Sequence, residues 1–242
     1  MMFFFKRKEI VLECFTNRPE LILDAPIDKA HKYMPEWWKS LPKPCLKPGE
    51  MVAEVNMRHC PGIIELYKHS ITIPMWSDLK LDIGGSTTEP YGCRWQFADR
   101  QSGMAVHNPA ERGVYLPDKH YQHLKLDTPW CLKTNGFVKW AWFGATWNAE
   151  SPESVIVPPA IDEYYHQHSS SINLFVPRTE QRRELLIPFR QPLVFLTPLT
   201  EHNLKLKHTL VSDEELRKID TSGGYTPKFF NSYYYKRKVR SK

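Results

Sequence analysis

A chain of 242 residues that is 41% hydrophobic and 25% charged is long enough to bury a sizeable core without disulfides or a structural metal. It contains no run of about eighteen apolar residues, so we expect no membrane span, and the apolar start at Phe3-Phe4-Phe5 is too short for a signal peptide. The five cysteines are scattered and form no C-x-x-C pair, which favours reduced thiols in a cytoplasm-assembled protein and argues against a zinc knuckle.

The positive charge is concentrated at the C-terminus. Residues 225–242 carry six lysines and arginines and no acidic residue, so they account for the whole formal net charge of +6 and leave residues 1–224 formally neutral. Basic and aromatic side chains together can bind nucleic acid, or can dock as an arm on an acidic neighbouring subunit; a solvated tail is the simpler alternative. The expected partner-binding residues are Phe229, Phe230, Tyr233, Tyr234, Tyr235, Lys236, Arg237, Lys238 and Arg240.

In the first half of the chain, short strands are expected around two helical segments. Residues 9–16 are rich in β-branched and aromatic residues and predict a strand. Residues 27–33 predict a short helix, and a second helix is expected to open at Pro61, because proline is favoured at the first helical position. Further strands are expected at 71–75, 80–83 and 94–98.

The second half predicts a denser series of strands and one helix. The strand expected at 138–143 lies in the aromatic-rich stretch 130–147, and it should be buried on both faces or meet another subunit on one of them. Ser212 and Glu215 form a capping box, which predicts a helix to about Asp220. The other expected strands are 155–157, 172–176, 184–187 and 193–199. Strands at this density indicate an all-β sandwich, barrel or clip.

Two groups of histidines raise the question of a metal. His166 and His168 would share one face of a strand, and His120 and His123 lie near Asp127. Iron oxygenases of the cupin type bind the metal through two histidines and one carboxylate, but the sequence order expected of that family is absent. We therefore expect loop histidines with solvent or backbone partners, no bound metal and no cofactor.

The stretch from Pro159 to Pro198 has a distinctive order of a turn-like segment followed by strand-like runs. The sequence P-A-I-D-E-Y-Y precedes a strand-like run at 171–176 and a second one that ends in L-V-F-L-T-P. This order resembles the C-terminal half of the β-clip fold of trimeric dUTPases, in which a motif A-I-D-x-D-Y-x-G forms a turn before a strand. The resemblance implies that Asp162 takes the place of the catalytic carboxylate and that Tyr165 takes the place of the tyrosine that stacks on the sugar.

The same resemblance fails at positions that the chemistry needs. Tyr164 occupies the second acidic position, Gln167 replaces the glycine of the motif, and Phe195 replaces the glutamine of the closing motif. No phosphate-cradling loop of the P-R-S-S-G kind occurs in the first 120 residues. Asp162 and Tyr165 are therefore vestigial candidates, and we expect no hydrolysis of deoxynucleotides.

Three further motifs are idiosyncratic and carry no recognisable chemistry. They are P-E-W-W-K-S-L-P at 35–42, C-P-G-I-I-E-L-Y at 60–67 and W-S-D-L at 76–79. With the clip-like stretch at 155–199, they are similar to a family of uncharacterised proteins of marine tailed phages, the cyanophage-type myoviruses. The resemblance implies a phage gene product and supplies no mechanism.

These observations predict a mainly β fold, a β-clip or jelly-roll-like barrel or sandwich with a few short helices. We expect a single domain over residues 1–224, with subregions at 1–100 and 130–210, followed by a basic aromatic arm at 225–242. The leading interpretation is a non-catalytic structural or accessory phage protein that packs against other phage proteins or itself, in the host cytoplasm during assembly and then in the virion. The alternatives are a divergent dUTPase-like nucleotide hydrolase, a cupin-like metal-dependent oxygenase, and a nucleic-acid-binding accessory protein that uses the basic tail.

Overall fold

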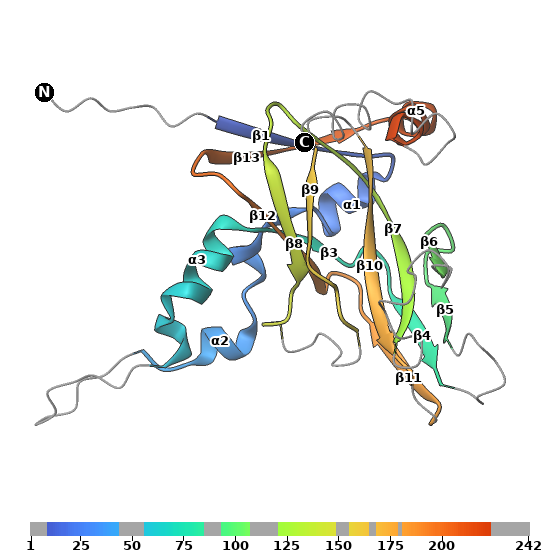
Figure 1. The fold of residues 1–242 in the computed structure, drawn as a ribbon, viewed down its shortest axis with the longest axis horizontal. Coiled ribbons are helices and arrows are strands. Elements are labelled where there is room, and N and C mark those ends of the chain that lie inside the picture. Colours follow the sequence, from blue (N-terminus) through green and yellow to red (C-terminus); the bar gives the residue numbers. More distant parts are fainter. Residues whose placement is uncertain are drawn as a thin grey trace, which may run out of the picture.

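The protein is built mainly of β-strands that form three sheets (Figure 1), as a computed structural model shows. The structure describes residues 9–43, 56–84, 93–106, 121–148, 155–164, 168–178 and 181–223; at 168, 169 and 220–223 only the backbone is described. The expected mainly β sandwich with a few short helices is confirmed, and the described strands do not close into a barrel.

The first sheet is arranged around one long strand. Its strand order is β10 (His168–Pro177), β7 (Tyr121–Thr134), β1 (Glu9–Thr16) and β13 (Asn203–Leu210), with β6 (Gly103–Val106) also paired to β7. β1 and β13 run parallel, and the other pairs are antiparallel. The alternation of β1 follows the strand period, since Ile10, Leu12 and Cys14 are buried on one face.

β7 changes partners along its length, and Pro129 lies where the change occurs. Residues 124–127 pair with β6 and residues 131–134 pair with β1. On the other side, the register with β10 shifts between Ser169 and Ser171, opposite the same point. A proline cannot donate to a ladder and is tolerated at such irregularities. This position explains how a 14-residue strand contains a proline in its interior.

The second sheet packs its tryptophans inward and its phenylalanines outward. Its strand order is β2 (Asp28–Lys29), β3 (Ile71–Pro74), β12 (Pro192–Pro198), β8 (Lys139–Gly144) and β9 (Ala160–Glu163). On β8, Trp140 and Trp142 belong to the main core. Phe143 lies on the other face, where it meets Phe195 of β12 with ring centroids 5.9 Å apart. The strand expected at 138–143 is therefore confirmed, with apolar contacts on both faces.

The third sheet is smaller and consists of β11 (Arg183–Ile187), β4 (Leu79–Ile83) and β5 (Cys93–Phe97), all antiparallel. Leu79, Leu81 and Ile83 of β4 alternate with polar residues and join the main core. At the end of β4, Gly84 has a φ of +105°, and a Cβ there would lie 2.6 Å from the carbonyl oxygen of Gln181. The turn therefore requires glycine.

The helices are short and mostly lie against the second sheet. They are α1 (Pro19–Asp24), a 3-10 helix at Ala30–Tyr33, α2 (Glu36–Ser40), a 3-10 helix at Met57–His59, α3 (Pro61–His69) and α5 (Asp213–Gly223). The capping box of α5 is confirmed, because the Glu215 N–H donates to Ser212 Oγ at 3.2 Å and the Ser212 N–H donates to Glu215 Oε2 at 2.9 Å. No helix of the described part of the chain has the length and apolarity needed to span a bilayer.

Several sequence expectations about elements were wrong. The acidic turn expected at Asp162 is strand β9, which pairs with β8. The strand expected at 155–157 is reduced to a single bridge between Ile156 and Phe175. The helix expected at 27–33 is a two-residue strand followed by a 3-10 turn. The strands β6, β7 and β13 and the helices α1 and α2 were not predicted.

Candidate functional site

The W-S-D-L motif joins three segments of the chain. Trp76 is buried and its Nε1 donates to Ser102 Oγ at 2.8 Å. Ser77 Oγ accepts the Asp99 N–H at 3.1 Å, and Asp78 Oδ1 accepts the Phe189 N–H at 2.7 Å. The motif therefore ties the β3–β4 connection to the turns after β5 and β11, which is a structural role.

Asp99 is the acidic centre of this junction. Its Oδ2 accepts hydrogen bonds from Arg18 Nη1 and Ser102 Oγ, both at 2.6 Å. Burial alone would raise the pKa of the Asp99 carboxyl, but the hydrogen bonds from Ser102, Arg18 and the Gln101 N–H together lower the pKa below its usual value. Because both carboxylate oxygens accept hydrogen bonds from these donors, we assign Asp99 a structural role.

The other two motifs form a second hydrophobic cluster on the outer face of the second sheet. Trp38 of α2 and Ile63 and Tyr67 of α3 pack with Phe195. Three hydrogen bonds fix the cluster to the turn after β8: Tyr67 Oη donates to Asn148 Oδ1 at 3.0 Å, Asn148 Nδ2 donates to the Tyr33 carbonyl at 2.8 Å, and Trp37 Nε1 donates to the Trp147 carbonyl at 2.9 Å. Both motifs are therefore explained by packing.

Of the two candidate site residues suggested by the dUTPase resemblance, only Asp162 belongs to the described part of the chain. Asp162 lies half-buried on the edge strand β9, opposite Trp140, and its Oδ1 accepts the Glu163 N–H at 2.8 Å. Tyr164 is fully buried beside Trp140 and Trp142, with ring centroids 6.2 Å from each. Tyr165 and Gln167 lie outside the described residues.

Of the four candidate histidines, only His123 has a described side chain. His123 Nε2 lies 2.9 Å from Asn173 Oδ1 within the first sheet, and Asp127 Oδ1 accepts from Ser171 Oγ at 2.9 Å. The backbone of His168 pairs with Leu132, while His120 and His166 lie outside the described residues. Among the described residues, no three His, Cys, Asp or Glu side chains gather as metal ligands.

A partly apolar surface lies at the β8–β9 half of the second sheet. We call it the β8–β9 face and define it by Phe137, Lys139, Ile161, Glu163 and Leu199. Lys139 is opposite Glu163, and its carbonyl accepts the Leu199 N–H at 2.8 Å. Ile161 is 64% exposed, and Phe137 and Leu199 are each 53% exposed. Ile161 lies on β9, which pairs with β8, Leu199 is hydrogen-bonded to Lys139, and Phe137 lies just before β8, so the three exposed apolar side chains belong to neighbouring positions around β8. Neighbouring exposed apolar side chains suggest a contact surface more strongly than scattered ones do.

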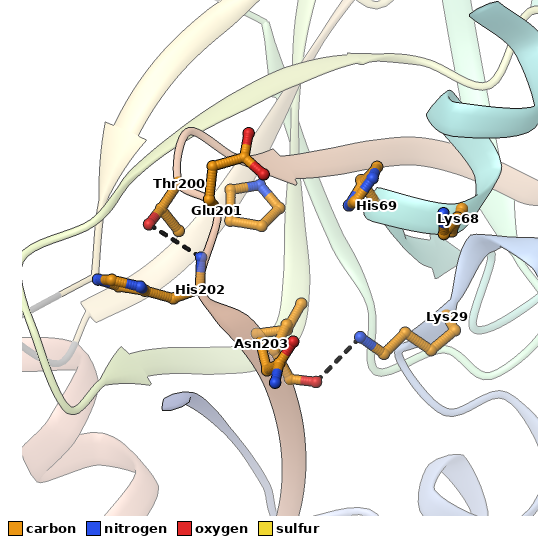
Figure 2. A pocket seen from close by; sticks show the side chains of 9 residues that line it. Lys29, Lys68, His69, Thr200, Glu201, His202 and Asn203 are labelled. Atoms are coloured by element: carbon orange, nitrogen blue, oxygen red, sulfur yellow. Dashed lines mark hydrogen bonds between the residues drawn. The ribbon is translucent and has the colours of Figure 1, made fainter. Parts of the chain in front are cut away.

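A polar cavity of about 390 Å³ lies at the other half of the same sheet, between α3 and the turn from β12 to β13. In Figure 2, Lys68 and His69 come from α3, Thr200, Glu201 and His202 come from the turn, and Lys29 reaches the start of β13 through its hydrogen bond to the Leu204 carbonyl. Its full lining is Lys29, Lys68, His69, Pro198, Thr200, Glu201, His202, Asn203 and Leu204. We call it the cationic pocket, because its lining contains two lysines and one carboxylate, together with two histidines.

Lys29 is the most constrained cation of the pocket. Its Nζ donates to the Leu204 carbonyl at 3.0 Å, a group on the outer edge of β13. Burial lowers the pKa of the Lys29 ammonium, and the neighbouring Asp28 carboxylate opposes this shift by favouring the charged form. The Lys29 side chain therefore also covers part of the edge of β13. Lysine side chains at a sheet edge commonly protect it from pairing with another chain.

Sequence reasoning missed both surfaces. The residues of the cationic pocket are far apart in the chain, at 29, 68–69 and 198–204, and none belongs to a recognisable motif. The partner-binding arm that sequence reasoning favoured, residues 225–242, lies outside the described residues. In comparisons with known proteins, no family model and no curated protein matches the chain.

Proposed function

We propose that the protein is a non-catalytic structural or accessory protein of a tailed-phage particle, which works by packing against neighbouring subunits. The observation that carries the proposal is the β8–β9 face, where Ile161, Leu199 and Phe137 expose apolar area beside charged residues. Such a face loses unfavourable contact with water when another chain covers it.

The occupant that we propose for this face is the basic aromatic arm, residues 225–242, of a neighbouring copy. The arm has rings that can cover Ile161 and Leu199, and it has six positive charges. On the face, Glu163 of β9 lies opposite Lys139 of β8 and supplies a carboxylate that the lysines and arginines of the arm can contact. Opposite charges on the two surfaces favour their association.

The arm of one subunit is long enough to contact a neighbouring subunit. It follows α5, which packs near β7 and β10 of the first sheet, whereas the β8–β9 face belongs to the second sheet. The eighteen residues of the arm span roughly 60 Å when extended. An arm of this length can leave its own subunit and reach the next one.

The motifs that resemble the marine phage family support a scaffold role. Trp38, Tyr67 and Trp76 are buried and hold elements together. Mass spectrometry of purified particles of the phage that encodes the chain tests the proposal. We expect the protein at the copy number of a particle component; its presence only in the lysate, at enzyme-like abundance, would argue for one of the catalytic alternatives.

A further inference from the structure

We propose that the cationic pocket binds a small dianion of the phosphate class. The proposal does not rest on subunit packing, although the two surfaces adjoin: Pro198 and Thr200 line the pocket, and Leu199 between them belongs to the β8–β9 face. The volume of about 390 Å³ is within the usual range of small-molecule sites.

Lys29 supplies the innermost charge. An ammonium has three donors, and in the described part of the chain Lys29 Nζ makes one hydrogen bond, to the Leu204 carbonyl. This bond fixes the side chain and leaves donors for a ligand. An anion beside Nζ would favour the charged form that partial burial disfavours.

Lys68 and His69 supply the second group of donors, and Glu65 positions both. Lys68 Nζ lies 3.3 Å from Glu65 Oε1, and His69 Nε2 lies 2.6 Å from Glu65 Oε2. Glu65 is not part of the pocket lining. Both side chains are therefore held at the rim of the pocket by a carboxylate that does not occupy it.

The turn after β12 supplies the third side of the site. Thr200 Oγ1 accepts the His202 N–H at 3.3 Å, which leaves the threonine hydroxyl proton available to a ligand. The His202 ring and the Asn203 amide line the same side (Figure 2). Donors that approach from three chain segments suit a tetrahedral anion better than a planar carboxylate.

The negative charge of Glu201 opposes the binding of an anion. Removing this charge and removing a lysine should therefore change phosphate affinity in opposite directions. The Glu201 carboxylate lines the pocket together with the cations. Removing this charge should strengthen the binding of a dianion, whereas removing Lys68 should weaken it. Substituting a lysine outside the pocket shows how far the change in net charge alone alters phosphate binding. Lys80 is the matched control, because it also pairs with a glutamate, Glu184 on the third sheet, at 2.8 Å.

The experiment is calorimetric titration of the full chain with inorganic phosphate at constant ionic strength. We expect saturable binding of one equivalent. Lys68→Met should weaken it by about tenfold, since hydrogen bonds to charged groups have this order of effect. Glu201→Gln should strengthen phosphate binding several-fold, and Lys80→Met should leave it unchanged.

Titration with two further compounds identifies the chemical class of the ligand. Acetate at the same ionic strength should bind at least about tenfold more weakly than phosphate, because it has one charge and a planar group. Glycerol phosphate distinguishes the two sources of a phosphate-class ligand: tighter binding than inorganic phosphate assigns a phosphomonoester, and weaker binding assigns the free ion. The proposal is overturned if phosphate gives no saturable binding, if acetate binds equally well, or if Lys80→Met weakens binding as much as Lys68→Met does.

Discussion

Tyr67 Oη donates a hydrogen bond to Asn148 Oδ1 at 3.0 Å, and both side chains are buried. The bond joins α3 to the turn after β8, and Asn148 passes the connection on to the Tyr33 carbonyl. The burial that excludes water here also raises the pKa of Tyr67 to about 12. The hydrophobic cluster on the outer face of the second sheet therefore contains a buried polar pair that links α3 to the turn after β8.

Removing the hydroxyl of this pair should destabilise the fold. Tyr67→Phe leaves Asn148 Oδ1 buried without its donor, and we expect the free energy of unfolding to fall by about 1.5 kcal/mol. Denaturation with urea measures this. Tyr121→Phe, at a half-buried position at the start of β7, is the matched control and should change stability by less than about 0.5 kcal/mol. Equal effects of the two substitutions would show that the pair does not stabilise the cluster.

Two glycines should respond in opposite directions to alanine. Gly84→Ala places a Cβ 2.6 Å from the Gln181 carbonyl oxygen at a φ of +105°, and it should lower stability by about 2 kcal/mol or more. Gly62→Ala lies in the first turn of α3, where the nearest atom is 4.0 Å from the new Cβ, and it should raise stability by about 0.5 kcal/mol. Thermal melting of the pair tests the backbone description; the same sign for both would contradict it.

Asp99 should make stability sensitive to acid. Because its pKa is lowered on folding, its contribution is complete above the pKa of the unfolded chain, about 3.9, and is lost as the pH falls through the folded value. Asp99→Asn should therefore reduce stability by about 2 kcal/mol at pH 7, and the difference from the wild type should shrink near pH 3. Unfolding with urea at both pH values checks this.

The control for Asp99 is Glu20→Gln on the exposed start of α1. It should alter stability little at either pH. A difference between wild type and Asp99→Asn that stays constant from pH 7 to pH 3 would contradict the account of the junction.

Asp162 should not catalyse hydrolysis. Its carboxylate lies on an edge strand and accepts the Glu163 N–H, and the positions that hold the catalytic loop in dUTPases are occupied by other residue types. We expect no turnover of deoxynucleoside triphosphates with magnesium. Turnover that disappears in Asp162→Asn while the circular dichroism spectrum is unchanged would restore the enzyme interpretation.

The sequence allowed those elements to be predicted whose pattern is local. β1 agrees with the expected residues 9–16 because Ile10, Leu12 and Cys14 keep a strict period of two. The capping box of α5 is similarly local, since Ser212 and Glu215 are three residues apart. In both cases the signal and the structure involve the same few residues.

Elements that depend on distant partners could not be predicted. β7 contains Pro129, which argues against a strand unless the change of partner from β6 to β1 is known. β13 is largely exposed and polar, and its strand character comes from the parallel pairing with β1. The cationic pocket depends on the approach of Lys29, Lys68 and Thr200, which only the tertiary fold brings together.

The arm should act through both charge and ring burial. Changing Lys236, Arg237, Lys238 and Arg240 together to Ser should remove the part of self-association that weakens with salt, because screening acts on exposed charges. Changing Phe229, Phe230, Tyr233, Tyr234 and Tyr235 to Ser should remove the part that persists at high salt. Association measured at low and high salt separates the two; an identical salt dependence in both variants would contradict this division.

Sedimentation velocity tests the proposed function most directly. Four proteins are compared at low salt: the full chain, a chain that ends at Gly224, the double variant Ile161→Ser with Leu199→Ser, and the control Leu23→Ser, which changes an exposed leucine on α1. We predict that the full chain and the control self-associate, and that the truncated chain and the double variant remain monomeric while keeping the wild-type circular dichroism spectrum. Equal self-association of the truncated and full chains, or a full chain that is monomeric at every concentration, would contradict the proposal that the arm of one copy docks on the β8–β9 face of the next.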